Sequence, residues 1–86
     1  MAKYDPLCRF LRASGEQNLD VGMDDIADMV VGGLPPSAYD RTRRMWWSNT
    51  ADVRHVQAGR GWLAAGYVVA GVDYAQRRVR FSRRSS

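Results

Sequence analysis

The chain has 86 residues, a formal net charge of +4 at pH 7 and a hydrophobic content of 45%. This length is enough for one compact domain and excludes two, and the apolar content excludes general disorder. The single cysteine, Cys8, excludes an internal disulfide, and with His55 as the only histidine a conventional zinc site is excluded as well.

The first predicted elements are a helix and a short strand. Asp5 and Pro6 are typical of a helix start, because aspartate caps the first turn and proline needs no donor there. Ser14–Gly15 ends this helix. Polar and apolar residues then alternate over Asn18–Met23, which predicts a half-buried β-strand.

Three further helices are expected in the middle of the chain. Their boundaries are marked by capping residues at the start and by glycine or polar residues at the end. The second helix lies between Asp24 or Asp25 and Gly32–Gly33, the third runs from Ser37 through Trp46, and the fourth lies between Ser48–Thr50 and Gly66.

A β-hairpin closes the predicted fold, with strands over 67–72 and 77–81 and a turn over 73–76. A lone strand is not stable, so Asn18–Met23 is expected to pair with this hairpin. The order helix, strand, three helices, β-hairpin predicts an α+β, winged-helix-like fold with a small three-stranded antiparallel sheet. We expect one domain over 1–86, with an ordered core over about 4–81 and a frayed tail over 82–86.

Four short motifs recur in this order in a family of small bacterial domains, which the chain therefore resembles. They are Tyr4–Leu7, Leu34–Pro35 with Ser37–Ala38, Trp46–Asn49 and Trp62–Tyr67. The tetrapeptide WWSN is the most specific of them. The resemblance covers nearly the whole chain and implies a shared fold in a bacterial cytoplasmic protein, but it transfers no activity. The chain departs from the pattern by about one extra residue around Val31–Gly33, and by Tyr67 where the family often has tryptophan.

Charge is distributed unevenly along the chain. Residues 1–40 contain three basic and seven acidic residues, a net charge of −4, whereas residues 41–86 contain ten arginines and two acidic residues, a net charge of +8. Arginine is suited to bidentate contacts with phosphates and base edges, so this asymmetry indicates DNA, most simply duplex DNA, as the partner. The predicted DNA-binding residues are Arg41, Arg43, Arg44, Trp47, Asn49, Arg54, Gln57, Arg60, Arg77, Arg78 and Arg80.

The helical residues of this set are expected to read bases, and the hairpin arginines to neutralise phosphates. In the major groove arginine pairs with guanine and glutamine with adenine. The segment Asp25–Trp46 resembles a helix-turn-helix with a long turn, and either the third or the fourth helix can be the recognition helix. In the alternative interpretation the arginines form a solvated face.

Adjacent residues on a helix point about 100° apart, so Trp46 and Trp47 cannot both fill one core site. We expect one of them to be partly exposed, with Trp47 stacking on a base and Asn49 bonding adenine or phosphate. The alternative is that one indole packs in the core, the other covers a helix junction, and Ser48 and Asn49 cap the next helix. Gly59 and Gly61 cost the fourth helix about 1 kcal/mol each relative to alanine, which indicates close approach by another helix or a DNA backbone.

No catalytic constellation is present, because the spacing nominates neither a nucleophile nor an orienting acid for His55. We expect no enzyme activity, no cofactor and no metal. The leading hypothesis is a cytoplasmic, non-enzymatic DNA-binding domain, such as a small transcriptional regulator or a nucleoid-associated protein. One alternative is a protein-interaction module, antitoxin-like or an adaptor, that binds a protein partner or a second copy of itself through an exposed tryptophan. Another is an accessory domain that enzymes carry by fusion. No membrane partner is expected, because the first residues lack a signal-peptide run and no stretch approaches the roughly 20 apolar residues that span a bilayer.

Overall fold

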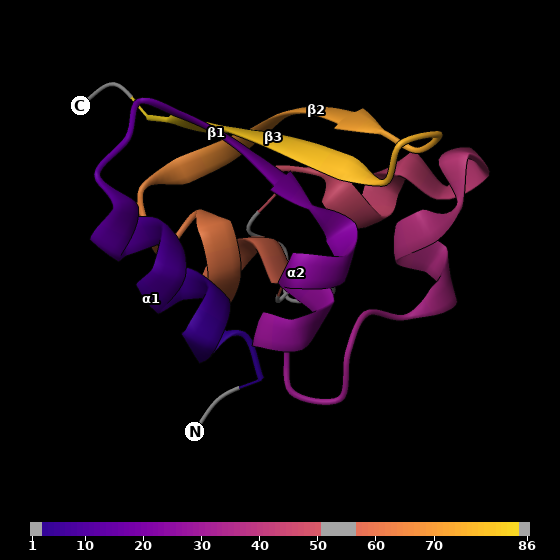
Figure 1. Ribbon diagram of the computed structural model, residues 1–86, viewed down its shortest axis with the longest axis horizontal. Helices are drawn as coiled ribbons and strands as arrows, with labels where there is room; N and C mark the ends of the chain where they lie inside the picture. The colour runs from indigo at the N-terminus through magenta and orange to yellow at the C-terminus, as the bar shows by residue number, and fades with distance from the viewer. Residues whose placement is uncertain (1–2, 51–56, 85–86) are drawn as a thin grey trace.

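Residues 3–50 and 57–84 are described in the computed structural model of the chain. Figure 1 shows a three-stranded sheet along one side of the molecule, with the helices packed against one face of that sheet. The elements in chain order are α1 (Asp5–Ser14), β1 (Asn18–Gly22), α2 (Met23–Met29), the short helices η1 (Pro36–Tyr39), η2 (Arg41–Trp47) and η3 (Ala58–Trp62), β2 (Tyr67–Asp73) and β3 (Arg78–Arg83). The fold is therefore α+β, as the sequence predicts.

The sheet confirms the predicted pairing of the early strand with the hairpin. β3 lies in the middle and is antiparallel to both β1 and β2. Val21 lies opposite Val79, so the apolar residues of the two alternating patterns share the inner face of the sheet. The strand ends at Gly22 because Met23 begins α2, although the Met23 backbone N–H still donates to the carbonyl oxygen of Arg77 (2.7 Å).

The third predicted helix is two short 3₁₀ helices, so the expectation of one helix from Ser37 through Trp46 is wrong. Asp40 separates them with extended backbone angles (φ −95°, ψ 113°). Its carboxylate accepts hydrogen bonds from the backbone N–H (2.9 Å) and the hydroxyl (2.7 Å) of Thr42. This cap starts a new helix at the point where the previous one would have continued. Arg43 also interrupts η2, with angles outside the helical region (φ −114°, ψ 50°).

The fourth predicted helix and the predicted tail differ from expectation as well. The described end of the fourth helix is η3, a π-helical turn closed by the N–H of Leu63 and the carbonyl oxygen of Ala58 (2.9 Å). The first part of that helix, over 51–56, lies outside the described residues. Ser82–Arg83 is not frayed, because both neighbouring strands extend far enough to pair with it as the end of β3.

Aromatic side chains fill the core beneath the sheet. Trp62 has no exposed surface, its ring stacks on that of Trp47 with centroids 5.6 Å apart, and it lies 6.0 Å from the ring of Phe81. The ring of Trp46 completes the cluster, 4.6 Å from that of Trp47. One group of rings thus joins η2, η3 and β3, and this fixes where η2 lies relative to the sheet.

We expect Trp62→Ala to destabilise the protein by about 3–5 kcal/mol, because truncating a core aromatic residue leaves a cavity. A small domain has a total stability of only about 5–15 kcal/mol, so the variant is expected to be largely unfolded near physiological temperature. Thermal unfolding followed by circular dichroism measures the change. Met45→Ala is the control, because Met45 is 66% exposed and its loss should cost less than about 0.5 kcal/mol. Equal melting temperatures for the two variants would contradict the central position of Trp62.

Candidate nucleic-acid interface

The turn of the β-hairpin contacts the short helices η1 and η2. The guanidinium of Arg77, in this turn, lies over the ring of Tyr39, 5.2 Å from its centroid. Arg77 has a φ of 54°, a left-handed conformation that costs a non-glycine residue roughly 1–2 kcal/mol. Burial raises the pKa of Tyr74 in the same turn, while nearby Arg44 opposes that rise and Asp40 adds to it. Two segments far apart in the sequence therefore meet at one end of the molecule.

The arginines gathered there form a basic surface, which we call the basic end. It consists of Arg41, Arg43, Arg44 and Arg77, whose side chains are exposed, with the rings of Tyr39 and Tyr74. Hydrogen bonds from Thr42 hold the pKa of Asp40 below its ordinary value, and Arg43 lowers it further. The Asp40 carboxylate lies 3.7 Å from Nε of Arg43 and partly balances that charge. Within residues 3–50 and 57–84, Arg41, Arg44 and Arg77 have no carboxylate partner.

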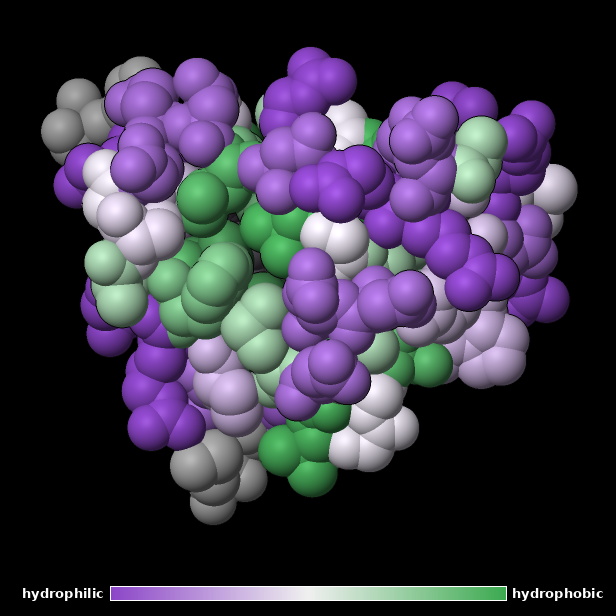
Figure 2. Space-filling view, in the orientation of Figure 1, coloured by the Kyte–Doolittle hydropathy of each residue, from purple (hydrophilic) through white to green (hydrophobic). Residues whose placement is uncertain are grey.

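Hydrophilic and hydrophobic side chains gather over different elements, with an exception on η2. Figure 2 shows mainly hydrophilic side chains over η1, η2 and the hairpin turn, whereas hydrophobic side chains gather on the front face between α1 and α2. Large apolar side chains exposed in the described part of the chain are Phe10 (40%), Val31 (56%) and, on η2 next to Arg44, Met45 (66%). The basic end is therefore a water-facing surface of charged and aromatic groups.

Arg78 and Arg80, predicted to contact phosphates, follow this turn in β3 and lie on the outer face of the sheet. The Nε of Arg78 donates to the Asp20 carboxylate (2.8 Å), and its Nη2 donates to the Asp20 carbonyl oxygen (3.1 Å). Both arginines line a shallow hollow of about 90 Å³ together with Asp20 and Asp73. An exposed ion pair of this kind contributes about 0–1 kcal/mol to stability. It leaves the outer face close to neutral.

Two of the residues predicted to contact DNA have side chains that lie in the core. Trp47 is 3% exposed, and its Nε1 donates to the carbonyl oxygen of Ala38 (2.8 Å). Gln57 is 5% exposed, and its Nε2 donates to the carbonyl oxygen of Trp46 (2.9 Å). Buried donors need such partners, so neither side chain is available to a base. The expectation that one of the two adjacent tryptophans is partly exposed is confirmed, but that residue is Trp46.

Asn49, predicted to bond adenine or phosphate, uses its amide within the protein. Its Oδ1 accepts hydrogen bonds from Nε1 of Trp62 (3.0 Å) and from the backbone N–H of Val69 (2.7 Å). Its Nδ2 donates to the carbonyl oxygen of Val69 (2.9 Å). The side chain thus pairs with the backbone of the edge strand β2 as another strand would. At the same time it provides the hydrogen-bond acceptor that the buried indole N–H of Trp62 needs. This is a structural role, and it is closer to the capping alternative than to base recognition.

Two predicted contacts remain, Arg54 and Arg60. Arg54 lies outside the described residues, as does His55. Arg60 is exposed on η3, where it lines a pocket against α1. The sequence prediction also missed Tyr74, because a tyrosine in a turn gives no sign of the helix it will contact. Tyr39 had such a sign, since it precedes the arginines of η2 in the sequence.

The fold and the site define a small α+β domain with a cationic, tyrosine-containing surface beside its hairpin turn. The chain belongs to the family Domain of unknown function (DUF7662), whose model matches residues 4–85. No curated protein and no solved structure matches the chain significantly. Over 3–50 and 57–84, no helix is long and apolar enough to cross a membrane. The same ranges contain no group of three or more histidine, cysteine, aspartate or glutamate side chains placed to hold a metal ion.

We expect Asn49→Ala to destabilise the protein by about 1–3 kcal/mol, because it leaves the indole N–H of Trp62 and the backbone groups of Val69 without partners. Chemical denaturation measures the loss. Ser48→Ala is the matched control, because in the described part of the chain the Ser48 hydroxyl makes no hydrogen bond. An Asn49→Ala variant as stable as Ser48→Ala would restore Asn49 as a candidate for ligand binding.

Proposed function

We propose that the protein is a nucleic-acid-binding domain that contacts the phosphates of duplex DNA through the basic end. The observation that carries the proposal is the position of Arg77, which brings the hairpin turn against η1 and η2 by packing over Tyr39 (5.2 Å). Arg41, Arg44 and Arg77 then present their charge on one surface without a carboxylate partner among the described residues. Guanidinium groups bind phosphate oxygens in pairs, and several such contacts give an affinity that depends strongly on salt.

The proposed contact is with the backbone rather than with base edges. Direct readout in the major groove is typical of an α-helix, whereas η2 is a seven-residue 3₁₀ helix interrupted at Arg43. Gln57, predicted to read adenine, is buried, and Arg54 lies outside the described part of the chain. The arginines of η2 that remain exposed are therefore on a short 3₁₀ helix. Tyr39 and Tyr74 are partly exposed and add stacking surfaces beside the arginines. Binding of this kind favours a nucleoid-associated role over a sequence-specific regulator.

The finer features expected from the sequence belong to the same proposal. These are a bacterial origin, a cytoplasmic location, a winged-helix-like topology and WWSN as the family's characteristic motif. The contacts of Trp47 and Asn49 support a structural reason for that motif, because both residues connect η2 to neighbouring elements. The alternative of a protein partner or homodimer held by an exposed tryptophan has less support, because Trp62 and Trp47 are buried and Trp46 is partly buried.

We expect the wild-type chain to bind random duplex DNA with a steep salt dependence, and Arg44→Ala/Arg77→Ala to weaken that binding on all sequences alike. Each phosphate contact removed should lower the slope of log affinity against log salt by about 0.9, so the double variant should flatten it by about two. Fluorescence anisotropy at several salt concentrations measures the slope.

The charge-matched control is Arg83→Ala/Arg84→Ala, which removes two positive charges where β3 ends, at the opposite end of the strand from the hairpin turn (Figure 1). Its slope should stay close to that of the wild type. Equal flattening by the two double variants would show that binding follows net charge and not the basic end. A wild-type chain with no affinity for duplex DNA even at low salt would refute the proposal and leave RNA or a protein as the partner to test.

A further inference from the structure

Met45 is the most exposed of the large apolar side chains in the described part of the chain. It follows Arg44 on η2, whereas the next two residues, Trp46 and Trp47, pack their rings against each other in the aromatic cluster. Because Met45 is 66% exposed, it lies on the outer side of η2 together with the exposed Arg44. This side chain adds little to the core and is available to a partner.

Positive charge dominates the helix that carries Met45. Three of the seven residues of η2 are arginines, and none is acidic. The Nε of Arg44 donates to the carbonyl oxygen of Arg41 (3.3 Å), which holds these two arginines within one turn of the helix. The hairpin turn adds Arg77, whose guanidinium packs over the ring of Tyr39. Phosphate groups are attracted to such a surface, so a bound nucleic acid lies next to Met45.

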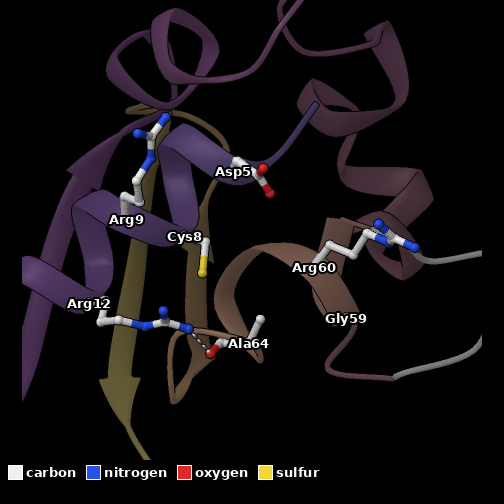
Figure 3. A pocket seen from close by; sticks show the side chains of 7 residues that line it. All are labelled: Asp5, Cys8, Arg9, Arg12, Gly59, Arg60 and Ala64. Atoms are coloured by element: carbon white, nitrogen blue, oxygen red, sulfur yellow. Dashed lines mark hydrogen bonds between the residues drawn. The ribbon is translucent and has the colours of Figure 1, made fainter. Parts of the chain in front are cut away.

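The other exposed large apolar side chains of residues 3–50 and 57–84 have different surroundings. Val31 directly follows α2, whose charged residues are all acidic. Phe10 is on α1, where arginines line a pocket against η3. Figure 3 shows that these arginines do not converge, because the Arg60 side chain extends away from Cys8 and Arg12. Met45 alone of the three lies among the arginines of the basic end.

The shape of the basic end suits the minor groove of DNA. The minor groove is about 6 Å wide and admits side chains, whereas the major groove admits a whole α-helix. Both parts of the basic end, the interrupted helix η2 and the hairpin turn, present side chains from tight turns. Minor-groove proteins hold the DNA with basic residues and often insert one apolar side chain, methionine among them, between two base pairs. Methionine is unbranched and flexible, so it fits a narrow gap.

We propose that Met45 is an intercalating residue that bends the DNA. Arg41, Arg44 and Arg77 contact phosphates along the minor groove, and the Met45 side chain enters between two base pairs. The inference rests on the proposed DNA contact and adds a mechanical effect to it. Partial unstacking of one step by such a side chain kinks a duplex by about 20–90° toward the major groove. Pyrimidine–purine steps open most easily, so the bend favours these steps.

The test measures bending and affinity separately on the full chain. Energy transfer between dyes at the two ends of a duplex of about 25 base pairs reports the bend, and anisotropy at several salt concentrations reports the phosphate contacts. The wild type is expected to increase the energy transfer. It should also bind a duplex with one mismatched pair about tenfold more tightly than a matched duplex, because the mismatch has already lost part of its stacking.

Met45→Gln keeps the length of the side chain but makes it polar. It should lose both the increase in energy transfer and the preference for the mismatch, while the salt slope stays unchanged because no phosphate contact is removed. Met45→Leu should keep both effects, because leucine also intercalates. Val31→Ala is the matched control, since it removes an exposed apolar side chain beside the acidic α2, and it should bend DNA as the wild type does. Equal melting temperatures show that the variants remain folded.

The outcomes separate this inference from the proposed DNA contact. A wild-type chain that binds duplex DNA with a steep salt slope but leaves the energy transfer unchanged would overturn the bending role alone. Equal bending by the wild type and Met45→Gln would do the same. No affinity for duplex DNA at low salt would overturn both proposals. Binding to phosphatidylserine vesicles that is lost in Met45→Gln, without any bending of DNA, would assign Met45 to a membrane surface instead.

Discussion

The burial of Trp62 is the constraint on which the rest of the structure depends. Helices cover the sheet on one face only, so one layer of large side chains has to fill the space between them. Trp62 lies in that layer with no exposed surface, against Phe81 of β3 and Trp47 of η2. Once these three rings are packed, η2 has little freedom to move relative to the sheet. The hairpin turn and the arginines of η2 then meet at the same end of the molecule.

Burying an indole also imposes a polar requirement, because its N–H needs an acceptor in the core. Ala38 provides one for Trp47, and Asn49 provides one for Trp62. Asn49 additionally pairs with the edge strand β2, where unpaired backbone groups would otherwise be open to another chain. The most unusual tetrapeptide of the sequence is therefore explained by the interior of the protein.

Arginines in the described part of the second half of the chain lie in different surroundings. Those beside the hairpin turn gather around one carboxylate, that of Asp40. Those on the outer face of the sheet lie beside Asp20 and Asp73, and Arg60 lines a pocket. Field strength depends on such local balance and not on the net charge of a segment. The same residue type thus supports a proposal for DNA in one place and links two neighbouring strands in another.

The sequence by itself determined the elements whose signals are local. Alternation defined β1, Asp5 and Pro6 marked the start of α1, and Gly66, with a φ of 86°, ends the segment before β2. The α+β class and the pairing of β1 with the hairpin followed, because a lone strand needs a partner. Only the tertiary structure decided which polar and aromatic side chains are accessible. The sequence pattern places Gln57 on an outward helix face and Trp47 at a binding surface, yet their side chains are only 5% and 3% exposed. Accessibility depends on contacts between segments far apart in the chain, and no local pattern encodes those contacts.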